Sequence, residues 1–165
     1  MTKNIDHELR CSVAIATRLI GDTWSMMILR DFMIFGGTRR FEQLREGLNI
    51  SRNVLTERLN TMLEGEIIRK SPVTEGAKRM EYKLSRKGWE LMPILTGIHQ
   101  WCETWRQDPT NSMLEFVDSQ TKQPIKALSL YSQDGRELGP PDVSVLPKSD
   151  EAIEYLEKFN TPPKK

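Results

Sequence analysis

The side chains best suited to chemistry lie on a predicted helix that begins after Ser51 and continues to about Gly65. Leucine and methionine recur on one side of this helix, which predicts a buried stripe. The other side is polar, and such side chains can hydrogen-bond to base edges or phosphates. Ser51 is at least as well suited to capping the helix, and it can serve both roles. We predict DNA contacts from Ser51, Arg52, Asn53, Thr56 and Asn60.

Basic residues are concentrated in the same part of the chain. Residues 36–87 carry twelve Lys or Arg against seven Asp or Glu, although the whole chain has a formal net charge of only +1. Such a local excess is typical of a surface that faces phosphates. Arg39 and Arg40 precede a short predicted helix and could reach phosphates, or one of them could pair with Glu42 or Glu46.

The spacing of apolar residues indicates the elements that position these groups. Helical spacing predicts helices over about 11–20, 22–34, 41–47 and 51–65, and a longer helix over 85–105 that Pro93 kinks. Strand-like alternation predicts a hairpin with strands at 67–73 and 80–84. Lys78 and Arg79 lie at its tip, where we expect them to contact the DNA backbone or minor groove. The order is that of a winged helix-turn-helix.

The helix predicted over 85–105 has a broad apolar stripe. It could pack on its own core or pair with a second copy of the chain, and we favour pairing because the small domain already has core helices. Tryptophans at such an interface could also hold a small-molecule effector of apolar character. We predict a homodimer whose interface contains Leu91, Leu95, Ile98, Trp101, Cys102 and Trp105.

The sequence near Asp108 indicates a boundary between a winged-helix domain over 1–108 and an appendage over 109–165. Beyond it, apolar runs at 114–117, 125–131 and 143–146 predict short strands, and a helix is expected over 149–159. The expected fold class is therefore mainly α with a small β-hairpin wing, followed by a small strand-rich C-terminal appendage with a terminal helix.

Composition and motifs argue against several other classes of protein. The hydrophobic share of 38% and charged share of 28% are typical of a globular chain, and no apolar run could span a membrane. The polar N-terminus does not read as a secretion signal, so we expect a cytoplasmic protein without membrane association. The sequence contains no phosphate-cradling loop, metal-ligand motif or catalytic constellation. We therefore expect that the protein is not an enzyme and binds no metal or cofactor.

Several short motifs occur in a characteristic order between Cys11 and Trp105. They are Arg18-Leu-Ile-Gly-Asp-Thr-Trp, Ile28-Leu-Arg-Asp-Phe, Arg39-Arg-Phe-Glu-Gln-Leu, Ile50-Ser-Arg-Asn-Val-Leu-Thr-Glu-Arg-Leu, Met80-Glu-Tyr-Lys-Leu-Ser and Lys87-Gly. Together they resemble the HxlR-type transcription regulators. The resemblance implies a MarR-like winged helix that works as a homodimer, with one recognition helix in each DNA half-site. It also implies that the first and last long helices form the dimer contact.

The resemblance also bears on Cys11, which matches an N-terminal cysteine that several family members use to sense oxidants or electrophiles. A helix N-terminus favours a reactive thiolate, but a cysteine is often a small buried apolar residue, so both interpretations stay open. The appendage also resembles a strand-rich tail with paired cysteines that ends some longer family members. Tyr131 and Asp134 stand where cysteines would be, so this tail offers no Cys or His ligands for zinc. We therefore expect a transcription regulator that binds a pseudo-palindromic operator. The alternative is a winged helix used for protein–protein contacts.

Overall fold

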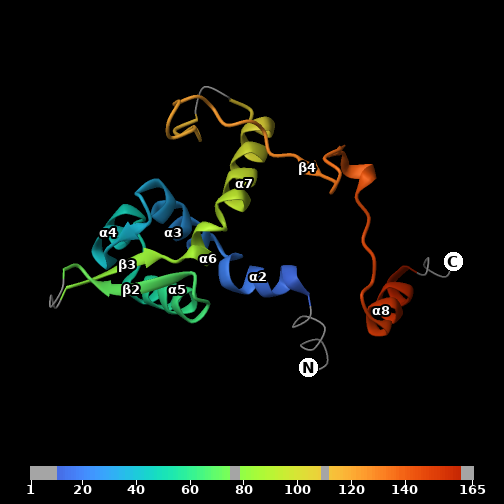
Figure 1. Ribbon diagram of the computed structural model, residues 1–165. Coiled ribbons are helices and arrows are strands. Elements are labelled where there is room, and N and C mark those ends of the chain that lie inside the picture. Colours follow the sequence, from blue (N-terminus) through green and yellow to red (C-terminus); the bar gives the residue numbers. More distant parts are fainter. Residues whose placement is uncertain (1–10, 75–78, 109–111, 161–165) are drawn as a thin grey trace. The chain divides into compact units, whose positions relative to one another are not determined.

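The computed structural model describes residues 11–74, 79–108 and 112–160, with side chains described up to Lys158. These residues form two compact units, one that extends to Lys126 and another that begins at Ala127 (Figure 1). The first unit extends past residue 108 because Phe116 packs against its core. The domain boundary expected at residue 108 stays a prediction.

The first two described helices form where the sequence predicts them. They are α2 (Ser12–Ile20) and α3 (Thr23–Ile34). Ile28 and Phe32 of α3 are fully buried, in line with the apolar face expected for this helix. Trp24 is an exception, because its side chain lies near the start of α3 and is 37% exposed. Trp24 has the helical spacing of Ile28 and Phe32, but it is not part of the buried core.

The helix-turn-helix consists of α4 (Phe41–Gly47) and α5 (Arg52–Glu64). Between them Asn49 has a φ of 51°, a left-handed conformation that asparagine tolerates better than most residues. Apolar side chains from α3, α4 and α5 meet in one core with residues of the hairpin. The fully buried members from these helices and from the segment just after α5 include Ile28, Leu29, Phe32, Leu44, Leu55, Leu59, Met62 and Ile67.

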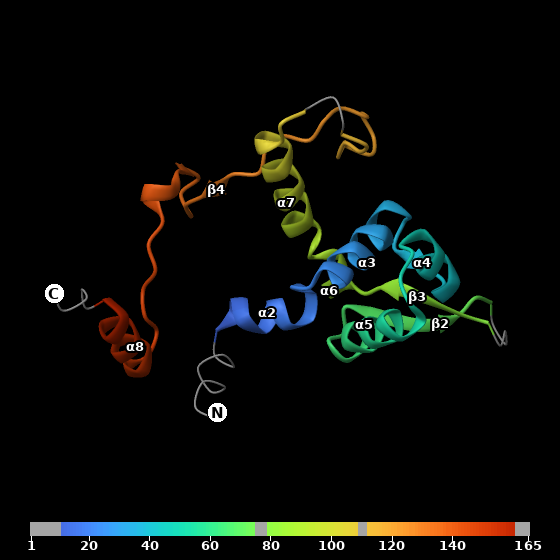
Figure 2. The same cartoon turned by 180° about the vertical axis from the view of Figure 1, so that it is seen from behind.

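A three-stranded antiparallel sheet provides the wing. It consists of β1 (Thr38–Arg39), β2 (Ile68–Pro72) and β3 (Met80–Leu84) in the order β1-β3-β2. The hairpin of β2 and β3 was predicted, whereas β1 was not. Gly37 leads into β1 with a φ of 80°, and a Cβ there would lie 2.5 Å from the ring of Trp89. Figure 1 and, from behind, Figure 2 show the hairpin running beside α5 and extending past it.

The long helix expected over 85–105 is two helices in the structure, and this prediction is wrong. They are α6 (Arg86–Trp89) and α7 (Met92–Trp105). Pro93 lies in the first turn of α7, where its missing N–H has no intrahelical partner to lose. It therefore begins a helix instead of kinking one. None of the helices in the described part of the chain is long and apolar enough to cross a membrane.

The C-terminal unit has fewer strands than expected. It contains the hairpin of β4 (Leu130–Tyr131) and β5 (Glu137–Leu138), a 3-10 turn at Pro140–Asp142, and α8 (Asp150–Asn160). The terminal helix is thus confirmed, and of the strand predicted over 125–131 only β4 forms.

Two other predicted strands of the appendage do not form. Val117 makes a single bridge with Pro124 instead of a strand at 114–117, and 143–146 is irregular. For 143–146 the physical reason is the lack of a core. Every residue from 127 to 158 is at least partly exposed, so no buried face rewards a longer strand there. Residues 114–117 belong to the first unit, but only Phe116 among them packs against the core, so they too lack a buried face.

Candidate nucleic-acid interface

The helix α5 has two chemically distinct faces. Leu55, Leu59 and Met62 are buried, with exposed fractions of 1% or less. On the outer face every predicted contact residue is exposed. These residues are Ser51, Arg52, Asn53, Thr56 and Asn60. Because the core holds the inner face, the outer side chains can meet a ligand without any change in packing.

Local hydrogen bonds define the start of α5. The Ser51 hydroxyl accepts a hydrogen bond of 3.3 Å from the backbone N–H of Val54, so Ser51 is a helix cap as the sequence suggested. The Thr56 hydroxyl donates to the carbonyl of Arg52 at 2.8 Å. Thr56 is exposed, and its hydroxyl oxygen can still accept a hydrogen bond.

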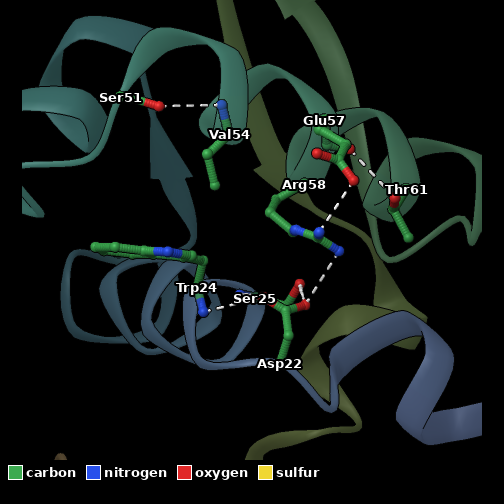
Figure 3. Close-up of polar contacts among 8 residues, drawn as sticks. All are labelled: Asp22, Trp24, Ser25, Ser51, Val54, Glu57, Arg58 and Thr61. Carbon is green, nitrogen blue, oxygen red and sulfur yellow. Dashed lines mark hydrogen bonds and ion pairs between the residues drawn. The ribbon is translucent and has the colours of Figure 1, made fainter.

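Arg58 ties α5 to the N-terminus of α3 (Figure 3). Its guanidinium lies 3.4 Å from the Asp22 carboxylate and 3.0 Å from the Glu57 carboxylate. Burial raises the pKa of Asp22, but hydrogen bonds from Ser25 and the charge of Arg58 outweigh it and hold this pKa below its ordinary value. Asp22 also caps α3 through the N–H of Trp24. Arg58 therefore has a structural role, because it joins α5 to the start of α3.

Arg52, in the first turn of α5, has a partner that the sequence did not reveal. Its Nη2 lies 2.6 Å from Glu42 Oε1 on α4, and its guanidinium carbon lies 5.0 Å from the ring centroid of Phe41. The other oxygen of Glu42 accepts a 2.6 Å hydrogen bond from Arg45 Nε. The hydrogen bond from Arg45 and the further one from Arg52 hold the pKa of Glu42 below its ordinary value. Glu42 is thus an ionised group at the edge of the candidate interface.

Arg39 does not present its side chain as the sequence suggested. Its side chain is 14% exposed, and its guanidinium lies 3.9 Å from the Asp31 carboxylate and stacks 3.9 Å from the ring centroid of Phe35. These contacts follow from the short strand β1, which turns the side chain toward α3. We therefore leave Arg39 out of the proposed interface. Arg40 is half-buried, and no ion pair joins it to another described residue, so it stays a candidate phosphate contact.

Of the two cations expected at the tip of the wing, the structure describes one. Arg79 is exposed just before β3, whereas Lys78 lies outside the described residues. Sequence reasoning missed two further exposed cations on β2, Arg69 and Lys70. Lys70 lies 5.7 Å from the ring centroid of Tyr82. The sequence did contain a signal for these two cations. They are adjacent charged residues in the predicted strand, which departs from a strict alternation of apolar and polar residues.

The predicted dimer residues divide into two groups. Leu91 and Leu95 pack on the core of their own chain. The others, farther along α7, are exposed in the single chain: Ile98 at 49%, Trp101 at 67%, Trp105 at 73%, and Cys102. The helix α2 also exposes apolar residues, with Val13 at 71% and Ile15 at 44%.

Cys11 is the N-cap residue of α2, and its thiol is exposed. The thiol makes no capping hydrogen bond, whereas the Cys11 carbonyl accepts one of 2.9 Å from the N–H of Ile15. Cys11 is thus accessible to a reagent and is not a buried apolar residue. Within the described part of the chain, no group of three or more His, Cys, Asp or Glu side chains could hold a metal ion.

The geometry defines the class of protein. Two helices joined by a tight turn, the second with an exposed polar face, stand beside an antiparallel hairpin with exposed cations. This is the winged helix-turn-helix fold, with α5 in the place of the recognition helix. A family model described as HxlR-like helix-turn-helix matches residues 19–110, which is more than half of the chain. The chain belongs to the HxlR-like helix-turn-helix family.

Its relatives include proteins named as regulators. An uncharacterized HTH-type transcriptional regulator of Mycobacterium tuberculosis is 34% identical over 98 residues, covering 59% of this chain and 61% of that protein. YvaP of Bacillus subtilis, with the same description, is 35% identical over 92 residues, covering 54% of this chain and 82% of its own. The match therefore spans only about three fifths of the mycobacterial relative.

Solved structures share the fold. The crystal structure of PA1607, a candidate transcription factor, superposes with a TM-score of 0.75 and 34% identity, covering 82% of this chain and 94% of that chain. The reduced form of the transcriptional regulator YodB from Bacillus subtilis superposes with a TM-score of 0.51 and 26% identity, covering 59% of this chain and 95% of that chain. Both agree with the winged-helix class.

Proposed function

We propose that this chain is a DNA-binding transcription regulator that acts as a homodimer on a pseudo-palindromic operator. Each subunit places α5 in the major groove of one half-site, and the cations of the wing contact the adjacent backbone. The observation that carries this proposal is the outer face of α5, where Arg52, Asn53, Thr56 and Asn60 are exposed on a helix whose other face is fixed in the core.

The proposed homodimer is supported by the exposed apolar faces of α2 and α7. Trp101 and Trp105 are two of the largest side chains in the protein, and exposing both in water is unfavourable. A second copy of the chain would cover these faces by symmetric pairing of the same helices. Such a dimer presents two recognition helices to DNA.

We expect a steep salt dependence of DNA binding. Arginine and lysine that neutralise phosphates release counterions, so log affinity should fall linearly with log salt, by about 0.9 for each phosphate contacted. Genomic fragments selected by the protein should bind about 10³-fold or more tighter than random duplex. Fluorescence anisotropy at several salt concentrations measures both quantities. Equal, weak binding to every duplex would instead favour the protein–protein module.

Cys11 is the proposed sensor of electrophiles. It is exposed at the start of α2, close in sequence to the apolar residues Val13 and Ile15. Alkylation there would add bulk beside the proposed dimer contact and shift the dimer away from its DNA-binding geometry. A solved structure of the similar regulator YodB is of its reduced form.

We expect treatment with N-ethylmaleimide to lower the affinity of the wild type for selected fragments by roughly tenfold, a typical coupling between two sites. The Cys11→Ser variant should keep its affinity. Cys102→Ser is the matched control. Cys102 is exposed in the single chain but lies on the predicted dimer face of α7, where a second copy would cover it, so this variant should respond like the wild type. Equal loss of binding in the wild type and in Cys11→Ser would remove the sensing role.

A further inference from the structure

The carboxylate of Glu42 joins the two helices of the helix-turn-helix through one arginine from each. Glu42 Oε1 lies 2.6 Å from Arg52 Nη2 at the start of α5, and Glu42 Oε2 lies 2.6 Å from Arg45 Nε within α4. Both oxygens of the carboxylate are therefore in use. Arg45 has a second carboxylate within reach, since its Nη2 lies 3.3 Å from Glu46 Oε1. Arg52, by comparison, forms its ion pair with Glu42.

This ion pair lies on the surface that would face DNA. The Arg52 side chain is 67% exposed and that of Glu42 is 48% exposed, so the pair is accessible from outside and no packed residue must move to open it. A carboxylate and a phosphate present similar pairs of oxygens to a guanidinium. Glu42 thus occupies the kind of position that a DNA phosphate would take on Arg52.

We propose that Glu42 is an internal competitor of DNA for Arg52 and lowers the affinity of the regulator for any duplex. This inference rests on the proposed function, because it requires α5 to face DNA. In the free protein Glu42 holds Arg52, and in the complex a phosphate replaces Glu42. Arg52 then contributes less to binding that relies on phosphates alone, so base contacts from the rest of α5 carry a larger share of the affinity.

The exchange has a thermodynamic signature in the salt dependence. When Arg52 neutralises a phosphate, a counterion leaves the DNA. In the wild type the negative charge of Glu42 beside Arg52 lowers the net positive charge brought to that phosphate and offsets part of this release. Without the Glu42 charge the offset is lost, so Glu42→Gln should steepen the slope of log affinity against log salt, by at most about 0.9 for each subunit whose Arg52 contacts a phosphate.

The change in affinity should be modest, because an exposed ion pair is weak. We expect Glu42→Gln to bind a random-sequence duplex about two- to fivefold more tightly at ~0.1 M salt, the range that corresponds to breaking one such pair. Glutamine keeps nearly the shape of glutamate and can still accept a hydrogen bond from Arg52. Thermal unfolding of the variant should therefore remain close to that of the wild type.

Glu46→Gln is the matched control. It removes the same charge from the same helix, but Glu46 contacts Arg45 and leaves the pair between Glu42 and Arg52 in place. Its salt slope should stay close to that of the wild type. A second comparison uses Arg52→Gln as background, where the proposal expects Glu42→Gln to change neither the affinity nor the slope appreciably.

The experiment is an anisotropy titration of the full chain and its variants with random-sequence duplex over a range of salt. An unchanged slope in Glu42→Gln would overturn the proposal. So would equal steepening in Glu46→Gln, or equal steepening in the Arg52→Gln background, because either result would assign the effect to general charge. Failure of the proposed function looks different, since the wild type itself would then show no salt-dependent binding to selected fragments.

Discussion

Replacing Trp101 by glutamate should convert the dimer into monomers and lower the affinity for selected DNA fragments by about 10²- to 10⁴-fold. The side chain is 67% exposed on α7, between Ile98 and Trp105, which are also exposed. A charge placed in a buried apolar contact costs far more free energy than it does on a free surface. The loss in affinity follows because a dimer holds its second recognition helix at a high effective concentration near the second half-site.

Sedimentation velocity measures the association state of this variant, and anisotropy measures its affinity for DNA. Met113→Glu is the matched control, because Met113 is 93% exposed but lies outside α2 and α7. It should remain dimeric with unchanged affinity. A Trp101→Glu protein that is still dimeric would show that these faces of α7 are not the contact. A monomeric wild type would contradict the proposed homodimer directly.

The helices of the DNA-binding unit could be predicted from the sequence because their signals are local. The apolar residues of α5 recur at helical spacing, and Ser51 before them is a good cap. The same holds for α4, whose bounds agree with those expected. In these helices the buried stripe, the cap and the breaker residues all lie within a few turns of one another, so no distant contact is needed to define them.

Elements that depend on distant partners were missed. The strand β1 has only two residues, Thr38 and Arg39, and it exists because it pairs with Lys83 and Tyr82 of β3. No alternation can be detected over two residues. The break before α7 is similar, since a run of apolar residues at helical spacing crosses it. There the sequence did contain a signal, because Pro93 suits a first helical turn better than a helix interior.

In the candidate interface, too, features set by local spacing could be predicted and contacts between separate elements could not. The outward direction of Asn53 and Thr56 follows from the period of α5 and was predicted. The partners of charged residues were not, because ion pairs between separate elements leave no mark on local spacing. Arg39 was expected on phosphates, yet it lies against Asp31. Glu42 was weighed as a partner of Arg39 or Arg40 and in fact holds Arg52.

A pair of substitutions on α5 tests whether its two faces act separately. Leu55→Ala should lower the free energy of unfolding by about 2–5 kcal/mol, because Leu55 is fully buried and its truncation leaves a cavity between α5 and the core. Asn53→Ala, two residues earlier on the exposed face, should change the free energy of unfolding by only about 0.5 kcal/mol. Urea unfolding measures both changes. The protein concentration must be the same for both variants, because the apparent stability of a dimer depends on it.

DNA binding should show the opposite order for the two variants. Asn53→Ala removes a side chain that can pair with a base edge, so its affinity for selected fragments should fall by about 1–3 kcal/mol, with little change for random duplex. Folded Leu55→Ala keeps every outer side chain and should bind selected fragments nearly as the wild type does. If Asn53→Ala binds both kinds of DNA unchanged while Leu55→Ala is destabilised as expected, α5 is a structural helix and base recognition must come from another part of the protein.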